Sequence, residues 1–238
     1  LCPGAAIVDN ANSIPAFDIL HASFVIRNTF EQYPEGSIHI ICVHSEAMKG
    51  QDHLAVRSKG HFFIGTDNGI FNLILNTEPD EAVKLIHKPG SDELDVFAKA
   101  AADIAAGKKL SEIGKSVSRI NERIPLRATI DKDVITGSII FIDSYGNAIS
   151  NITKELFRRV FEEKEYRIYI QSNKNHTDHI VEKYSDVPVG DMLARFNSLD
   201  LLEISINGAN ISELLSLSVG SVLRIDSINR TVLPNRLF

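Results

Sequence analysis

The chain has 238 residues, of which 44% are hydrophobic and 24% charged, a composition typical of a globular protein with room for two modest domains. Its net charge is −6 and its basic residues form no run, which argues against a nucleic-acid-binding surface. No apolar run approaches the length of a membrane span, so we expect no membrane partner.

The first residues and the two cysteines bear on the cellular compartment. No basic segment opens the chain at Leu1–Gly4, as a secretory signal would require. The chain begins at Leu rather than Met, so we expect that a natural N-terminus precedes Leu1. Cys2 and Cys42 are too few and too scattered for a disulfide framework, which favours a reducing, cytoplasmic location.

The first half alternates strand and helix patterns. The pattern predicts a strand at Ala5–Val8, then a helix that begins at Pro15 and is apolar nearly all round, hence buried. A polar loop is expected from His44 to Asp52. Further predicted elements are strands at 37–43, 53–58, 61–66 and 70–75, a helix at 92–106 with Gly107 at its end, and a short helix after Lys108.

The second half is dominated by strands. They are predicted at 134–142, 148–152, 165–171, 201–206 and 222–226, with short helices at 153–161 and 211–217. We place the domain boundary in the charged connector between Lys108 and Asp133. The expected fold is therefore an α/β N-terminal domain, residues 1–125, whose central sheet is flanked by helices. A smaller β-rich, barrel-like C-terminal domain, residues 133–238, follows it.

The most specific stretch for chemistry is Ile142–Ile152, IDSYGNAISNI. Asp143 ends a strand, Gly146 allows a tight turn, and Tyr145 and Asn147 lie beside it. A hairpin with turn-forming residues explains this pattern by itself. Alternatively, a carboxylate, an aromatic ring and a carboxamide within five residues suit an ammonium, a flat ring and that ring's polar edge.

This stretch resembles the Ile-Asp-x-Phe-Gly-Asn-x-x-Thr-Asn-Ile motif of the S-adenosyl-L-methionine (SAM) hydroxide adenosyltransferase family, which includes the fluorinase and chlorinase. Four further segments are similar to family motifs in the same order. They are Ile7–Ile19, Phe30–Val43, Thr66–Gly69, which matches Pro-Asp-Asn-Gly, and Asn197–Ile204, which is similar to Asn-Ser-x-Gly-x-Leu-Glu-Ile.

The resemblance implies a fold, a ligand and a reaction. Family members bind SAM between the N-terminal domain of one subunit and the C-terminal domain of its neighbour in a homotrimer. A halide or hydroxide attacks the ribose 5′ carbon and methionine leaves, without a metal or other cofactor. The family's opening strand, which supplies a ribose-binding Asp, would fall before Leu1. We therefore expect SAM or adenosine as a small-molecule ligand and no cofactor.

Individual roles follow from the resemblance. Asp143 would face the methionine amino group, Tyr145 would stack on adenine, and Asn147 would bind the adenine edge. Ser198 would lie near the methionine carboxylate, and Phe17 near the sulfonium or ribose. A plain helix-core role for Phe17 and a turn role for Ser198 remain alternatives.

The chain departs from the family at the residues that activate water. Where hydroxide-using members have an Asp, an Arg and a His, an ungapped register places His44, Gln51 and Asp92. In one interpretation the acid–base machinery is lost and the protein only binds SAM or adenosine. In the other, His44 and Asp92 exchange places and rebuild an imidazole–carboxylate pair that hydrolyses SAM. In another alignment of this loop with the family, Glu46 or Asp52 would be the catalytic residue instead.

Other histidines and one turn have simpler interpretations. His44, Glu46, Asp52 and His53 lack the spacing of known zinc motifs, so we expect no metal. His176 and His179 are expected at a solvated hairpin tip. The Asp67–Gly69 stretch is expected first as a hairpin turn and second as part of a pocket mouth.

Overall fold

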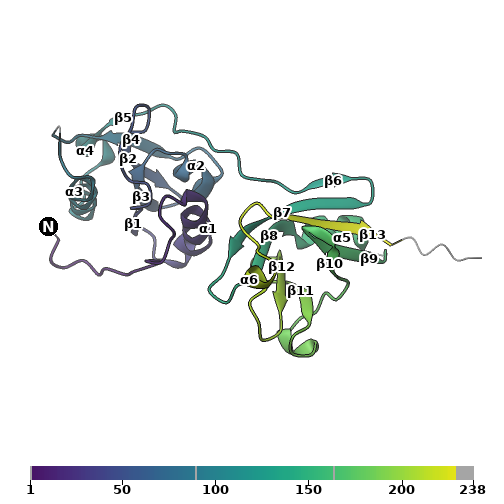
Figure 1. Cartoon of the computed structure of the whole chain (residues 1–238). Helices are drawn as coiled ribbons and strands as arrows, with labels where there is room; N and C mark the ends of the chain where they lie inside the picture. The colour runs from purple at the N-terminus through teal and green to yellow at the C-terminus, as the bar shows by residue number, and fades with distance from the viewer. Residues whose placement is uncertain (1, 89, 163, 229–238) are drawn as a thin grey trace, which may run out of the picture. The chain divides into compact units, whose positions relative to one another are not determined.

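The computed structural model describes residues 2–88, 90–162 and 164–228, and the chain divides into two compact units, Leu1–Pro125 and Leu126–Phe238. Figure 1 shows both units along the chain. The predicted domains include Leu1 and residues 229–238. These residues lie outside the part of the chain that the structure describes. Each unit has its own hydrophobic core and is described by itself.

The N-terminal unit is built on a five-stranded mixed sheet of order β1-β3-β2-β4-β5. Strand β1 runs parallel to β3, and the other pairs are antiparallel. Lys59 and Gly60 turn the chain between β2 and β3, both with positive φ (50° and 76°), as the sequence pattern predicts. The strands are β1 (Ile38–Ile40), β2 (His53–Ser58), β3 (His61–Thr66), β4 (Glu81–Leu85) and β5 (Gly114–Ser116).

Helices cover both faces of this sheet. Alternate residues of β2 point to opposite faces, so that Leu54 and Val56 enter one core while Ala55 enters the other. The first core lies under α1 (Ile19–Thr29), the 3₁₀ turn η1 (Phe30–Gln32) and α2 (Ile70–Leu75). The second lies under α3 (Glu93–Ala105) and α4 (Leu110–Ile113). The expected α/β domain with flanking helices is confirmed.

The predicted structure of the first twenty residues is wrong in two places. Residues 5–8 form no strand, and the side chain of Ile7 is 89% exposed, because no neighbouring strand pairs with them. The helix predicted from Pro15 begins at Ile19, since Phe17 has a left-handed φ of 65° and the Asp18 side chain caps His21 N. This helix is also less buried than expected, because only one side of it packs on the core.

The predicted strand at Ile70–Leu75 is a helix, α2. Its residues are almost all buried, and a short apolar run buried on every side looks the same for a strand and a helix. Consequently the Asp67–Gly69 stretch is a strand-to-helix turn rather than a hairpin, with Gly69 at φ 95° before the helix and Asn76 at φ 54° after it.

The C-terminal unit is an eight-stranded antiparallel sheet of order β10-β9-β13-β7-β8-β12-β11, with β6 beside β7. The two ends of this order approach each other, because Ala194 of β11 bonds through its backbone to His179 and Val181, just after β10. The strands are β6 (Thr129–Asp131), β7 (Val134–Ile142), β8 (Ala148–Thr153), β9 (Tyr166–Ile170), β10 (Ser172–Thr177), β11 (Met192–Phe196), β12 (Leu201–Ile206) and β13 (Val222–Ser227). The predicted barrel-like domain is confirmed.

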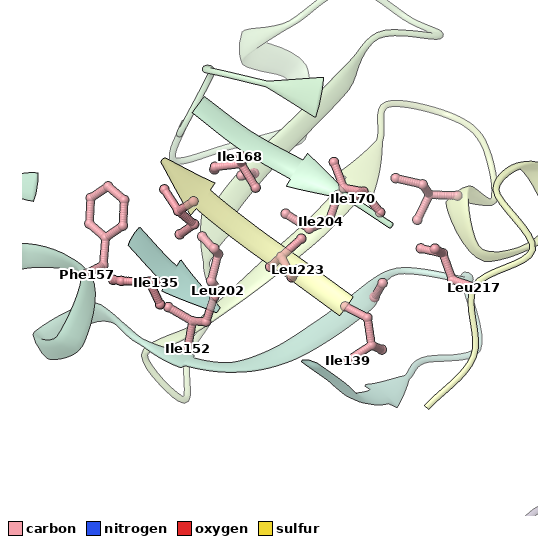
Figure 2. Close-up of a cluster of buried hydrophobic side chains, with 14 of the residues drawn as sticks. Ile135, Ile139, Ile152, Phe157, Ile168, Ile170, Leu202, Ile204, Leu217 and Leu223 are labelled. Atoms are coloured by element: carbon pink, nitrogen blue, oxygen red, sulfur yellow. The ribbon is translucent and has the colours of Figure 1, made fainter. Parts of the chain in front are cut away.

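Figure 2 shows the interior of this sheet, filled by branched aliphatic side chains from several strands. Ile135, Ile168 and Leu223 are fully buried there. Helix α5 (Lys154–Phe161) adds Phe157 and Phe161 to the same core. The short helix α6 (Ile211–Leu214) and the 3₁₀ turn η2 (Tyr184–Asp186) complete the unit.

Three strands of this unit, β6, β10 and β11, were not predicted from the sequence. Strand β10 reads SNKNHT and is largely exposed, so it lacks the apolar alternation by which strands are recognised. His176 therefore lies in a strand paired with β9 rather than at a hairpin tip. Strand β11 follows a polar turn and pairs along its whole length with β12.

Candidate functional site

The N-terminal unit contains a pocket of about 380 Å³ beside the loop that joins β1 to β2. The residues before α1 form one wall and the loop itself forms another, while the first turn of α3 adds a carboxylate. The lining residues are Ile14–Phe17, Cys42–Glu46 and Glu93. Two of the predicted site residues, Phe17 and His44, are thus brought together.

Phe17 and His44 both hold unusual backbone conformations. Their φ angles are 65° and 52°, in the left-handed region that residues other than glycine rarely adopt. Their rings meet edge to face with centroids 5.5 Å apart. Phe17 remains 73% exposed, so it is not part of the helix core, and its ring faces the pocket instead.

Three buried side chains hold the His44 loop in place. Asn68 Nδ2 donates to the His44 carbonyl at 3.0 Å, and Asn68 Oδ1 accepts from Ile70 N at the start of α2. His53 Nε2 lies 3.0 Å from the Ser45 carbonyl, which also accepts from the Thr66 hydroxyl. Since a carbonyl only accepts, this Nε2 carries the proton of the His53 ring.

Asp67, beside Asn68, ties this turn to the connector that follows β5. Its carboxylate accepts two bonds from the backbone N–H of Asn121. Burial raises the pKa of the Asp67 carboxyl, against the lowering effect of that hydrogen bond. The structure therefore gives the Asp67–Asn68 pair a scaffolding role behind the pocket.

The other two predicted catalytic residues lie outside the pocket lining. Asp92 is exposed and caps α3, with Oδ1 accepting from Leu94 N at 2.9 Å. Gln51 pairs through its backbone with Met48, and within the described residues its buried Oε1 has no hydrogen-bond partner. Two other residues of the loop were alternatives in the alignment. Glu46 lines the pocket, whereas Asp52 forms a 2.7 Å ion pair with Lys84.

Glu93 is the pocket carboxylate that the sequence reasoning did not select. It is half-buried, and the Ser45 hydroxyl donates to its Oε1 at 3.5 Å. Burial raises the pKa of the Cys42 thiol, and the negative charge of Glu93 raises it further. The capping rule could have identified Glu93. An Asp that precedes a helix commonly caps it, so the next acidic residue is the one available to a pocket.

Metal clusters and membrane-spanning helices are both absent from the described part of the chain. In residues 2–88, 90–162 and 164–228, no three His, Cys, Asp or Glu side chains gather closely enough to hold a metal ion. No helix in those ranges is long and apolar enough to cross a membrane.

In the C-terminal unit, the Asp143 carboxylate organises the turn between β7 and β8. Oδ1 accepts from the backbone N–H groups of Tyr145 and Asn147, both at 2.9 Å. Oδ2 accepts from Asn147 Nδ2 at 3.0 Å. These bonds bring Asp143 and Asn147 into direct contact while leaving the carboxylate room for a further donor.

The same turn leaves its aromatic ring open to solvent. Tyr145 is 79% exposed, whereas the Asn147 side chain is buried. Gly146 has φ 82°, and an added Cβ there would overlap Oδ1 of Asn210, the cap of α6. Ser212 N also donates to the Gly146 carbonyl, so α6 fixes the turn from behind.

A polar network joins η2 to the neighbouring strands β11 and β12 around the buried Glu203 and Ser205. Tyr184 donates to Glu203 Oε1 at 2.7 Å, and Ser205 donates to the same atom. Arg195 stacks over the Tyr184 ring at 4.8 Å. Burial, followed by the Glu203 hydrogen bond and charge, raises the pKa of Tyr184 to about 12, and the charge of Asp143 contributes.

Ser198 lies in the exposed turn between β11 and β12. Asn197 shapes this turn, because its Oδ1 accepts from the backbone of Leu199 and Leu201.

Comparison with protein families assigns both halves of the chain. Residues 1–114 match the SAM hydroxide adenosyltransferase N-terminal domain, and residues 137–224 match the SAM hydroxide adenosyltransferase C-terminal domain.

Curated relatives span most of the chain. A protein of Thermus thermophilus named (R)-S-adenosyl-L-methionine hydrolase is 27% identical over 94% of this chain and 89% of its own length. A hydrolase of the same name from Methanocaldococcus jannaschii is 25% identical over 89% and 80%. A fluorinase of an Actinoplanes species is 19% identical over 94% and 89%.

Solved structures share the fold. An uncharacterized conserved protein from Thermotoga maritima superposes with a TM-score of 0.83 at 20% identity, covering 94% of this chain and 90% of that one. A conserved hypothetical protein from Thermus thermophilus gives a TM-score of 0.73 at 26% identity, covering 95% and 88%.

Proposed function

The chain belongs to the SAM hydroxide adenosyltransferase family, and on that premise we propose that it hydrolyses SAM to adenosine and L-methionine. The observation that carries the proposal is the family match over both halves of the chain, together with relatives named SAM hydrolase along most of its length. The pocket with His44 and the turn with Asp143 provide the polar groups that such a reaction needs.

The chemistry is a substitution at the ribose 5′ carbon. A water oxygen bonds to C5′, the C5′–S bond breaks, and its electron pair returns to sulfur as the neutral thioether of methionine. A base takes the proton that water loses. The sulfonium is already an activated leaving group, so the reaction requires no metal or other cofactor, and a desolvated pocket favours the loss of charge.

Ligand roles in this proposal fall to the residues predicted from the family motif. Asp143 binds the methionine ammonium, Tyr145 stacks on adenine, and Asn147 hydrogen-bonds the adenine edge. Ser198 lies at the methionine carboxylate. The open face of Tyr145 and the spare acceptor capacity of Asp143 support these assignments.

The catalytic roles centre on the pocket. Phe17 packs near the sulfonium or ribose, and His44 takes the proton from water as a neutral imidazole. Catalytic roles for Gln51 and Asp92 stay predictions from the ungapped alignment with the family, because neither residue lines the pocket.

Product analysis tests the proposal. The protein is incubated with SAM, and adenosine and methionine are measured by chromatography, with SAM binding measured separately by calorimetry. Equal amounts of the two products are expected, at rates well above the protein-free control. Binding without adenosine would contradict hydrolysis and select the alternative of a SAM- or adenosine-binding protein. A 5′-halo-adenosine formed in chloride or fluoride would show a halide nucleophile instead.

We also propose a homotrimer, following the family. Light scattering on the purified 26.3 kDa chain should then give three times that mass. A monomer at micromolar concentration would contradict the assembly.

A further inference from the structure

We propose that Glu93, on the first turn of α3, is the carboxylate that acts with His44 on the attacking water. The inference rests on the proposed SAM hydrolysis and adds a catalytic residue that the family motif does not place. In this scheme water donates one O–H to Glu93 and the other to His44. His44 takes the second proton as the C5′–O bond forms and the C5′–S electron pair moves to sulfur. Glu93 stays anionic and stabilises the imidazolium.

The first argument is position. Glu93 and His44 line the same pocket of about 380 Å³, which has room for water beside part of a ligand. Glu93 is half-buried, whereas Glu46, the other carboxylate of the lining, is exposed. A carboxylate partly removed from solvent exerts a stronger field on an adjacent group.

The second argument is availability. Asp92 is exposed, and its Oδ1 accepts from Leu94 N as the cap of α3. Within the described residues, Glu93 forms no ion pair with a lysine, arginine or histidine, and the hydrogen bond that it accepts from Ser45 is long at 3.5 Å. Its oxygens can therefore accept further bonds from the pocket.

The third argument is that Glu93 contacts the loop that carries His44. Ser45, the immediate neighbour of His44, donates a hydrogen bond to Glu93. Glu93 thus contacts the loop at Ser45, the residue next to His44. Its negative charge also adds to the effect of burial in raising the pKa of the Cys42 thiol, another residue of the pocket lining.

The test compares Glu93→Gln with two substitutions on the same turn. Asp92→Asn tests the register assignment, and Asp95→Asn is the matched control, since Asp95 is an exposed acid of that turn outside the pocket lining. The kcat and KM for adenosine release are measured against pH. Glu93→Gln is expected to lower kcat by about 10²–10⁴-fold with KM changed by less than about threefold. Asp95→Asn is expected to keep the parental kcat.

A second readout does not depend on turnover. In a Cys2→Ser background, the alkylation rate of Cys42 is followed against pH. Glu93→Gln should move this profile to lower pH, because a nearby negative charge is removed, and Asp95→Asn should not move it.

Three results would overturn the inference: parental kcat in Glu93→Gln, an equal or greater loss in Asp92→Asn, or an unmoved Cys42 profile in Glu93→Gln. A parent protein that releases no adenosine would instead overturn the proposed function, and the role of Glu93 with it. An active parent with an unimpaired Glu93→Gln variant would overturn the role of Glu93 alone.

Discussion

His44 combines a left-handed backbone with a ring that faces Phe17, and these two properties can be separated by mutation. Asparagine tolerates positive φ better than other non-glycine residues. His44→Asn should therefore keep the fold while removing the imidazole. We expect kcat for adenosine release to fall by about 10²–10⁴-fold.

The melting temperature provides the control for this substitution. It should change little in His44→Asn, since Asn68 anchors the backbone carbonyl at position 44 rather than the ring. A variant with full activity would show that another group takes the proton from water.

A second residue-scale prediction concerns a buried histidine pair away from the pocket. His39 Nε2 lies 3.4 Å from His61 Nδ1, and the rings of Phe30, Tyr33 and Phe63 surround His39. Burial, followed by the charge of His61, lowers the pKa of His39 to about 4. The charged groups near this pair are Lys59, above the Phe30 ring, and Glu31, which binds Lys59.

The sign of the resulting pH effect follows from this lowered pKa. Below pH about 6.5 the unfolded chain protonates this imidazole while the folded protein resists until about pH 4. Folding stability should therefore drop by about 3 kcal/mol between these pH values because of His39 alone. Denaturant unfolding at pH 7 and pH 4.5 measures the difference. His39→Gln should flatten the dependence, whereas the exposed His87→Gln should not. Equal slopes in parent and His39→Gln would contradict the burial argument.

At the scale of elements, the turn between β7 and β8 depends on a close approach to α6. An alanine at position 146 would have to adopt a φ of 82° and displace Asn210, which caps α6 through Glu213 N. We expect Gly146→Ala to cost about 1–3 kcal/mol and to weaken SAM binding.

Gly220→Ala is the matched control, because its φ is 93° but no atom lies within 4 Å of the added Cβ. Chemical denaturation of both variants separates backbone strain from the clash. An equal loss in the two variants would mean that the contact with Asn210 does not hold the turn.

Which elements could be predicted depended on the turn and cap signals at their ends and on the period of their apolar residues. Strands β2 and β3 are buried on both faces but lie between turn signals, and helix α3 has an apolar stripe and an Asp cap, so their predicted bounds hold within a residue. Helix α2 is apolar on all sides and β10 is polar on nearly all sides, and neither pattern carries a period. In both cases tertiary packing decides the structure.

The candidate site shows the same limit. The motif at Asp143–Asn147 is local in sequence, so its internal hydrogen bonds could be anticipated from the residue types. The pocket joins residues 14–17, 42–46 and 93, which only the fold brings together. The ungapped register selects Asp92, and the capping rule indicates that its carboxylate caps the helix, but only the fold shows that Glu93 lines the pocket.

For the molecule as a whole, ligand binding should appear as added stability. A ligand at 100 times its Kd stabilises the folded state by about 2.7 kcal/mol. SAM should therefore raise the melting temperature of the parent protein. Asn147→Ala should reduce this shift, since a hydrogen bond at the adenine edge is lost at a cost of about 1–3 kcal/mol. An unchanged shift in Asn147→Ala would remove Asn147 from the ligand site.

The central claim, that water is the nucleophile at the ribose 5′ carbon, can be tested with isotopic water. The protein is incubated with SAM in H₂¹⁸O, and the released adenosine is analysed by mass spectrometry. The account predicts one ¹⁸O atom in adenosine, at the 5′ hydroxyl, and none in methionine. Unlabelled adenosine, or bound SAM that yields no adenosine, would contradict it.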